Sequence, residues 1–235
     1  MILIVPLAHP FARLMLRLVP EVESGLVRHL DRHLLSDPFI ALEAVRTTTE
    51  DIFREQLVLA EAVLDGRSVG ISGQVEALAR ALDKTERFLD EVHSQPERPR
   101  EWQLLMACIH GLDHMARLNH RLRAAVAAAP GRAGLADRRG LLAQSIQRIG
   151  AAPHWKSAAQ AAGELAARLE QGSRARREEI MGEVAGGRMD VDAGGDWLEA
   201  DRWLTRVAHH LWRISHHLQL ADDASHRDSP PLGAL

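Results

Sequence analysis

The chain has 235 residues, and its 29 lysines and arginines against 32 aspartates and glutamates give a net charge of −3 with histidine neutral. Such a balanced charge provides no broad cationic field for a nucleic-acid backbone, so we expect no nucleic-acid partner. The 46% hydrophobic and 26% charged residues exclude a disordered chain. The single cysteine, Cys108, excludes an intrachain disulfide and fits a reducing cytoplasm.

Alanine, leucine, arginine and glutamate are abundant, whereas runs of β-branched residues are few and no useful stretch alternates between apolar and polar. These features favour helices over strands. The composition therefore predicts an all-α fold.

Residues 1–36 form an N-terminal unit with an apolar start that Pro6, His9 and Pro10 interrupt. The apolar run is too short to span a bilayer, which takes about 20 residues, and no basic region precedes it as in a signal peptide. Two interpretations stay open. The unit is a strap packed on the domain, or it is a membrane-proximal segment that continues from a membrane helix or docks at the interface.

Three long helices are predicted within residues 37–130, over about 38–65, 73–92 and 100–129. Asp37 and Ser72 are the expected N-caps of the first two. Apolar residues recur at spacings of three and four along each segment, as in a helical seam. Short connections between such helices predict an antiparallel three-helix bundle.

Residues 131–222 repeat this plan, with helices predicted at about 135–149, 155–183 and 196–220. Gly186–Gly187 and Gly194–Gly195 are expected to bracket a flexible link, and residues 223–235 to form a disordered tail. Arg117–Leu122 also matches Arg213–Leu218, which lies 213 − 117 = 96 residues later. We therefore expect two pseudo-repeated antiparallel three-helix bundles.

Polar residues interrupt the apolar seams at five positions, Thr49, Gln56, Thr85, Asn119 and Ser215. A buried polar group is costly when it lacks a partner. We expect these side chains to hydrogen-bond across the bundle and to fix the register of the helices. The alternative is that they line a channel for a ligand.

Histidines on the third and sixth predicted helices are candidate ligands. His110 and His114 are four residues apart with Asp113 beside them, a spacing that can place two imidazoles and a carboxylate on a transition metal. The alternative is that these side chains are simply exposed or hydrogen-bonded. On the sixth helix, an aromatic and basic stripe is expected either to pack internally or to contact a partner, and its residues are Trp203, His210, Trp212, Arg213 and His217.

Motifs for nucleophilic or phosphate chemistry are absent from the sequence, which has no GxSxG, no Walker loop and no HExxH. Cys108 lies on an apolar seam, where a thiol is usually inert. We therefore expect no catalytic residues, no cofactor and no enzymatic activity.

Three segments carry a resemblance to a known family: residues 38–44 (PFIALEA), 84–91 (KTERFLDE) and 202–214 (RWLTRVAHHLWRI). They resemble the cytosolic PhoU-like C-terminal domain of bacterial sodium/phosphate cotransporters. The resemblance implies a six-helix domain that regulates phosphate uptake by binding to a membrane phosphate permease, covalently attached or separate. It also implies a cytoplasmic location, at the inner face of the cell membrane.

Residues 112–118 (LDHMARL) look like a degenerate copy of the acid-x-x-x-Asp motif that holds metal clusters in PhoU-like proteins. Here Arg117 follows Asp113, and His209 and Arg213 occupy the repeated positions. An arginine cannot ligate a cation, so we expect an Asp113–Arg117 ion pair instead. A metal-binding bundle that uses Asp113, His110 and His114 is the alternative function, and a second copy of the chain is the other partner that the sequence allows.

Overall fold

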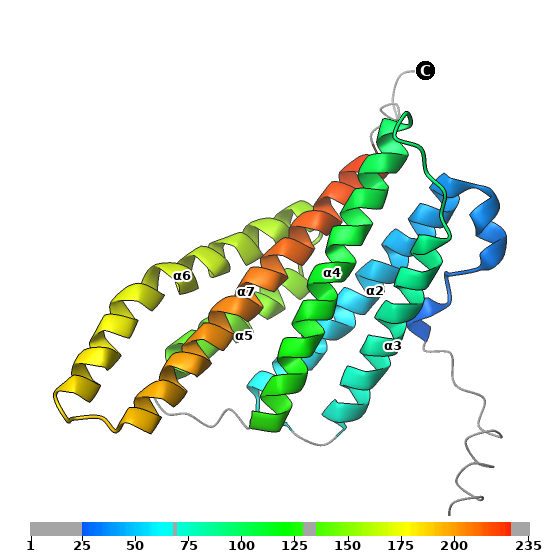
Figure 1. The fold of residues 1–235 in the computed structure, drawn as a ribbon. Helices are drawn as coiled ribbons and strands as arrows, with labels where there is room; N and C mark the ends of the chain where they lie inside the picture. Colours follow the sequence, from blue (N-terminus) through cyan, green and yellow to red (C-terminus); the bar gives the residue numbers. More distant parts are fainter. Residues whose placement is uncertain (1–24, 68–69, 129–134, 227–235) are drawn as a thin grey trace, which may run out of the picture.

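A computed structural model describes residues 25–67, 70–128 and 135–226, and within them every regular element is a helix. The prediction of an all-α fold is confirmed. Of the N-terminal unit expected over residues 1–36, residues 1–24 with its apolar start lie outside the described residues. The elements are η1 (Gly25–Val27), η2 (Arg32–Ser36), α2 (Pro38–Leu64), α3 (Ile71–Asp90), α4 (Pro99–Ala128), α5 (Ala136–Gly150), α6 (Trp155–Ala185) and α7 (Val191–His226) (Figure 1).

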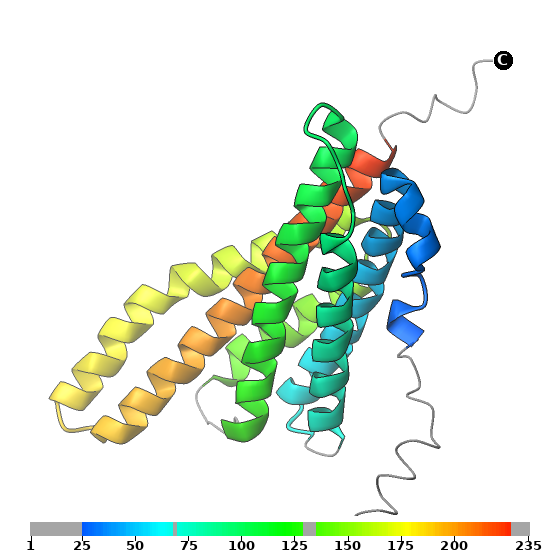
Figure 2. The same ribbon diagram turned by 45° about the vertical axis from the view of Figure 1, so that its right-hand side comes forward.

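Helix α7 lies between α6 and α4 and joins the two halves of the molecule. Helices α2, α3 and α4 contact one another, and α7 packs along both α6 and α4. Helix α5 contacts α6 and also reaches α2. Figures 1 and 2 show α6 and α7 as a long hairpin whose turn lies far from α2 and α3. None of the described helices is long and apolar enough to cross a membrane.

The start of α2 agrees with the sequence, and the start of α3 does not. Asp37 accepts hydrogen bonds from the backbone N–H groups of Phe39 (3.0 Å) and Ile40 (3.2 Å), with Pro38 at the first helical position. Helix α3 instead begins after Gly70, whose φ of 81° favours glycine. The prediction of Ser72 as its N-cap is wrong, because α3 already begins at Ile71.

The predicted boundaries of the last helix are also wrong. Helix α7 begins at Val191 and runs through Gly194 and Gly195, which we expected in a flexible link. A Cβ on Gly194 would lie 2.6 Å from Val184 Cγ2, so this glycine permits close packing of α7 on α6. At its other end α7 continues to His226, so the predicted disorder is wrong for residues 223–226. Residues 227–235 lie outside the described part of the chain.

The five polar residues on the seams form three different arrangements. The Gln56 amide donates to a backbone carbonyl of α4 (2.9 Å), and the Asn119 amide donates to one of α3 (3.1 Å), as predicted. Thr49 and Thr85 were expected to bridge helices, but each hydroxyl donates at 2.7 Å to the carbonyl one turn earlier in its own helix. The buried Ser215 hydroxyl has no hydrogen-bond partner among the described residues.

A buried ion pair that the sequence did not reveal joins α5, α6 and α7. Arg138 Nε lies 2.8 Å from Asp201 Oδ1, and the two side chains are only 5% and 7% exposed. Ser173 of α6 donates to Asp201 Oδ2 at 2.9 Å, and Arg138 donates to the Leu169 carbonyl at 2.8 Å. These contacts hold the middle of α6 and the first third of α7 against α5.

Replacing Asp201 with alanine leaves the Arg138 guanidinium buried without a counter-ion. We expect the free energy of unfolding, measured with urea, to fall by about 3–5 kcal/mol. The double variant Arg138→Met, Asp201→Leu fills the space with apolar side chains and should recover most of this loss. A loss below about 1 kcal/mol in Asp201→Ala, as for an exposed pair, would contradict the buried ion pair.

Candidate functional site at the crossing of α4 and α7

Helices α4 and α7 run antiparallel and are joined near both ends by hydrogen bonds to the backbone. Arg100 Nε donates to the Ala224 carbonyl at 2.9 Å, and the Trp203 indole N–H donates to the Arg121 carbonyl at 3.0 Å. The two bonds set the register of the pair. Histidines of α4 and α7 therefore meet in the stretch between these two hydrogen bonds.

The histidine cluster consists of His110 and His114 of α4 with His209, His210, His216 and His217 of α7. The ring of His114 lies at its centre, with its centroid 5.6 Å from that of His210 and 5.8 Å from that of His217. The ring of His110 also packs on that of His217, with the two centroids 5.2 Å apart. The structure thus brings together histidines that the sequence singled out on two separate helices.

The interior of the histidine cluster is short of hydrogen-bond partners. His217 is only 6% exposed, and neither of its ring nitrogens has a hydrogen-bond partner in the described residues. The Nδ1 atoms of His114 and His210 are likewise buried and unpaired. A buried charge without a partner is far more costly than a buried neutral ring, so these imidazoles are held neutral.

The pKa values of the three inner histidines follow from this burial. The pKa of His217 is lowered to about 4, chiefly by burial and then by the nearby charge of Arg213. Burial also lowers the pKa of His210 to about 4, with smaller contributions from His114, His209, Arg121 and Arg117.

The pKa of His114 is lowered as well, first by burial and then by Arg213. The other charged groups that act on it are Asp113, which opposes the shift, and His209 and Arg117, which add to it. Cationic neighbours outnumber the single carboxylate, so protonation of this ring is unfavourable.

Three arginines surround the outer side of the histidine cluster. Arg117 pairs with Asp113 at 3.0 Å, which confirms the predicted ion pair. Arg213 Nε donates to His114 Nε2 at 3.3 Å. Within the described ranges, neither Arg121 nor Arg213 forms an ion pair with a carboxylate. We call this set the arginine–histidine patch, and its members are Arg117, Arg121, Arg213, His114, His209 and His210.

The stripe that the sequence offered as a partner surface is partly internal. His217 is buried, and the Trp203 indole is bonded to α4. Trp212 packs against α6, where a Cβ on Gly163 would lie 3.3 Å from the indole. Of the five predicted residues, His210 and Arg213 are the ones that join the arginine–histidine patch.

The predicted metal ligands do not form a site in this structure. Asp113 is engaged by Arg117, and His114 Nε2 accepts from Arg213. No group of three or more His, Cys, Asp or Glu side chains in the described part of the chain is arranged to hold a metal ion. Cys108 is buried, as predicted, and burial raises its pKa to about 12, so its thiol is not a ready nucleophile.

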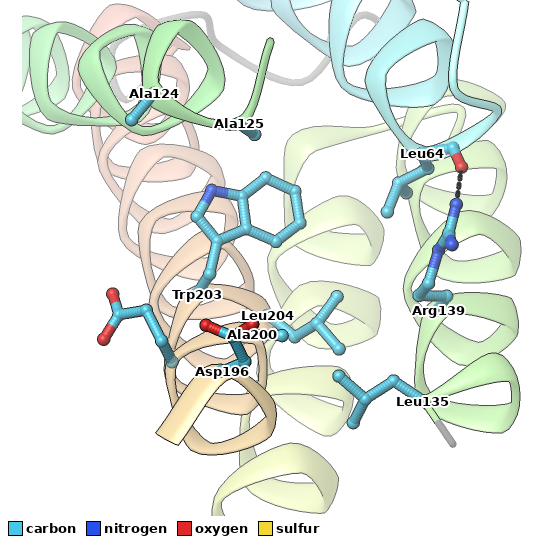
Figure 3. Close-up of a pocket in the computed structure, with 10 residues that line it drawn as sticks. Leu64, Ala124, Ala125, Leu135, Arg139, Asp196, Ala200, Trp203 and Leu204 are labelled. Atoms are coloured by element: carbon cyan, nitrogen blue, oxygen red, sulfur yellow. Dashed lines mark hydrogen bonds between the residues drawn. The ribbon is translucent and has the colours of Figure 1, made fainter. Parts of the chain in front are cut away.

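A mainly apolar cavity of about 200 Å³ lies beside the crossing, between the ends of α2 and α4 and the starts of α5 and α7. Figure 3 shows Trp203 of α7 projecting into it near Ala125 of α4, with the Arg139 guanidinium bonded to the Leu64 carbonyl. Sequence periodicity gave no sign of this space, because its walls come from four different helices.

Comparisons of the chain with protein-family models, with curated proteins and with solved structures found no match in any of the three. The function is therefore argued from two sources. One is the geometry where α4 packs on α7, and the other is the resemblance in sequence.

Burial of neutral histidines makes stability depend on pH. The unfolded chain binds a proton at each histidine near pH 6.5, whereas folded His210 and His217 do so only near 4. Between these values the unfolded state holds more protons, so the free energy of unfolding falls as pH falls. The slope is at most about 1.4 kcal/mol per pH unit for each histidine.

Urea unfolding from pH 7 to pH 4 measures this slope. The variant His217→Leu takes up about one proton fewer on unfolding, so its free energy of unfolding should depend less steeply on pH. His93→Gln, which removes an exposed histidine between α3 and α4, is the matched control. A slope that is the same in His217→Leu and in the unmodified chain would show that His217 is not held neutral.

Proposed function

We propose that the chain is a PhoU-like regulatory domain that controls phosphate uptake by a sodium-coupled phosphate transporter, and that it acts by binding and not by catalysis. The observation that carries the proposal is the meeting of His114 and His210 at the crossing, with ring centroids 5.6 Å apart. The internal repeat has an offset of 96 residues, and 114 + 96 = 210. Residues at a two-fold axis meet their own equivalents, so this contact is the one that two repeated halves would make.

Neighbouring contacts agree with the same two-fold relation. Arg213 bonds to His114, and the repeat converts this pair into Arg117 and His210. Arg117 is close enough to His210 to contribute to the lowering of its pKa. The first helices of the two halves, α2 and α5, also contact each other. These contacts support a pseudo-repeated pair of three-helix bundles, the architecture that the PhoU-like resemblance implies.

The positions that correspond to the metal-binding motif favour a role in binding anionic groups. Asp113 and Arg117 of α4 have His209 and Arg213 as their repeat equivalents on α7. Two of these four positions are arginine, which repels a cation and pairs with carboxylates and phosphates. We propose that this face meets the membrane phosphate permease, covalently attached or separate, at the cytoplasmic side of the membrane.

Sodium-driven phosphate uptake into membrane vesicles that carry the permease tests the proposal. We expect uptake to fall when the chain is present, and the double variant Arg121→Glu, Arg213→Glu to relieve the inhibition because it reverses the charge of the contact face. The double variant Arg80→Glu, Arg168→Glu, at exposed arginines of α3 and α6, makes the same change of charge elsewhere and serves as control. Equal uptake with and without the unmodified chain would contradict the proposal.

A further inference from the structure

We infer that the arginine–histidine patch is a binding site for a phosphate-type oxyanion, either inorganic phosphate or the phosphate of a lipid headgroup. The inference goes beyond the proposed function, because it assigns a ligand to the chain itself whichever transporter the chain regulates.

The local charge balance is the first argument. Of the charged groups that act on the rings of His114 and His210, three are guanidinium groups, those of Arg117, Arg121 and Arg213, and one is a carboxylate, that of Asp113. Glu86 of α3 interacts with Asp113 and does not act on either ring. The patch therefore carries an excess of two positive charges, 3 − 1 = 2, on a chain whose net charge is −3. A dianion matches this excess, whereas a metal cation would be repelled.

Convergence of the arginines is the second argument. Arg213 of α7 is held in place by its bond to His114 and by the Trp212 ring, whose centroid is 5.6 Å from its guanidinium carbon. On α4, Arg117 is held one turn from Asp113, the neighbour of His114, by their 3.0 Å ion pair, and the Arg121 backbone is bonded to Trp203 of α7. Both arginines are close enough to the His210 ring to lower its pKa. Arginines from two packed helices thus surround the same histidines, and the guanidinium groups of Arg213 and Arg117 are already held in place before a ligand binds.

The free donors of the patch suit a tetrahedral oxyanion. Arg213 uses Nε for His114, which leaves its two terminal nitrogens as donors, and Arg121 has no carboxylate partner in the part of the chain that the structure describes. His209 is exposed at the edge of the patch, with its ring centroid 6.4 Å from that of His114, and adds a ring donor. Forked guanidinium donors from different directions match the several oxygens of a phosphate better than the two oxygens of a carboxylate.

Isothermal titration of the full chain with inorganic phosphate tests the inference. The buffer contains about 0.15 M sodium chloride, where the Debye length is about 8 Å and diffuse attraction is screened. We expect saturable binding at one site. The double variant Arg121→Gln, Arg213→Gln should weaken it at least about tenfold, the effect of losing hydrogen bonds to a charged group. The control Arg80→Gln should bind like the unmodified chain.

Cosedimentation with vesicles distinguishes the two sources of phosphate. Phosphatidylcholine vesicles with and without phosphatidic acid are mixed with the same three proteins. Binding to phosphatidic acid without binding to free phosphate identifies a lipid headgroup, and binding to both identifies the phosphate group itself. Either result supports the inference if the double variant loses the binding. No binding to either ligand, or binding that the double variant retains, would overturn it.

Far-UV circular dichroism checks that the variants are folded, which we expect because Arg121 and Arg213 are both partly exposed. If the double variant unfolds, Arg213→Lys keeps the charge, loses the fork, and should still bind phosphate more weakly than the unmodified chain. Absence of binding to both free phosphate and phosphatidic acid, with intact control of uptake, would overturn this inference alone. Phosphate binding without control of uptake would overturn the proposed function alone.

Discussion

The packing of α7 along α4 depends on burying His217 as a neutral ring. With both nitrogens unpaired and only 6% of the residue exposed, this imidazole is tolerated in the interface only without a charge. The rings of His110 and His114 cover it, and they do so only in the antiparallel register that Arg100 and Trp203 fix at the two ends. Because α7 also carries α6, the position of the whole second half follows from this register.

The same burial determines the electrostatics of the outer face. Neutral imidazoles neither offset nor add to the charge of the guanidinium groups around them. The charge around the inner rings therefore comes from the arginines of the patch and from Asp113, the carboxylate that acts on His114. An oxyanion bound there would favour the protonated form of the nearest rings, so ion binding and proton uptake would be coupled. A surface of this kind suits a domain that responds to anionic groups through binding.

Much of the fold was predictable because helix starts and seams are local patterns, as at the Asp37 N-cap. The errors arose where one residue type serves two purposes. Gly194 resembled a loop glycine but permits close helix packing, and the Thr49 hydroxyl reaches its own helix more easily than a neighbour. The role of Arg121 and the buried Asp201 pair were missed because the pattern along one helix does not show what faces it from another.

The most direct test of this account is a histidine-resolved NMR titration from pH 8 to pH 4, with and without inorganic phosphate. The account predicts that the His210 and His217 rings stay neutral to about pH 4 without phosphate. It also predicts that phosphate raises the pKa of His210, which lies beside Arg117 and Arg121. Titration of both rings near 6.5, unchanged by phosphate, would contradict the buried crossing and the anion site together.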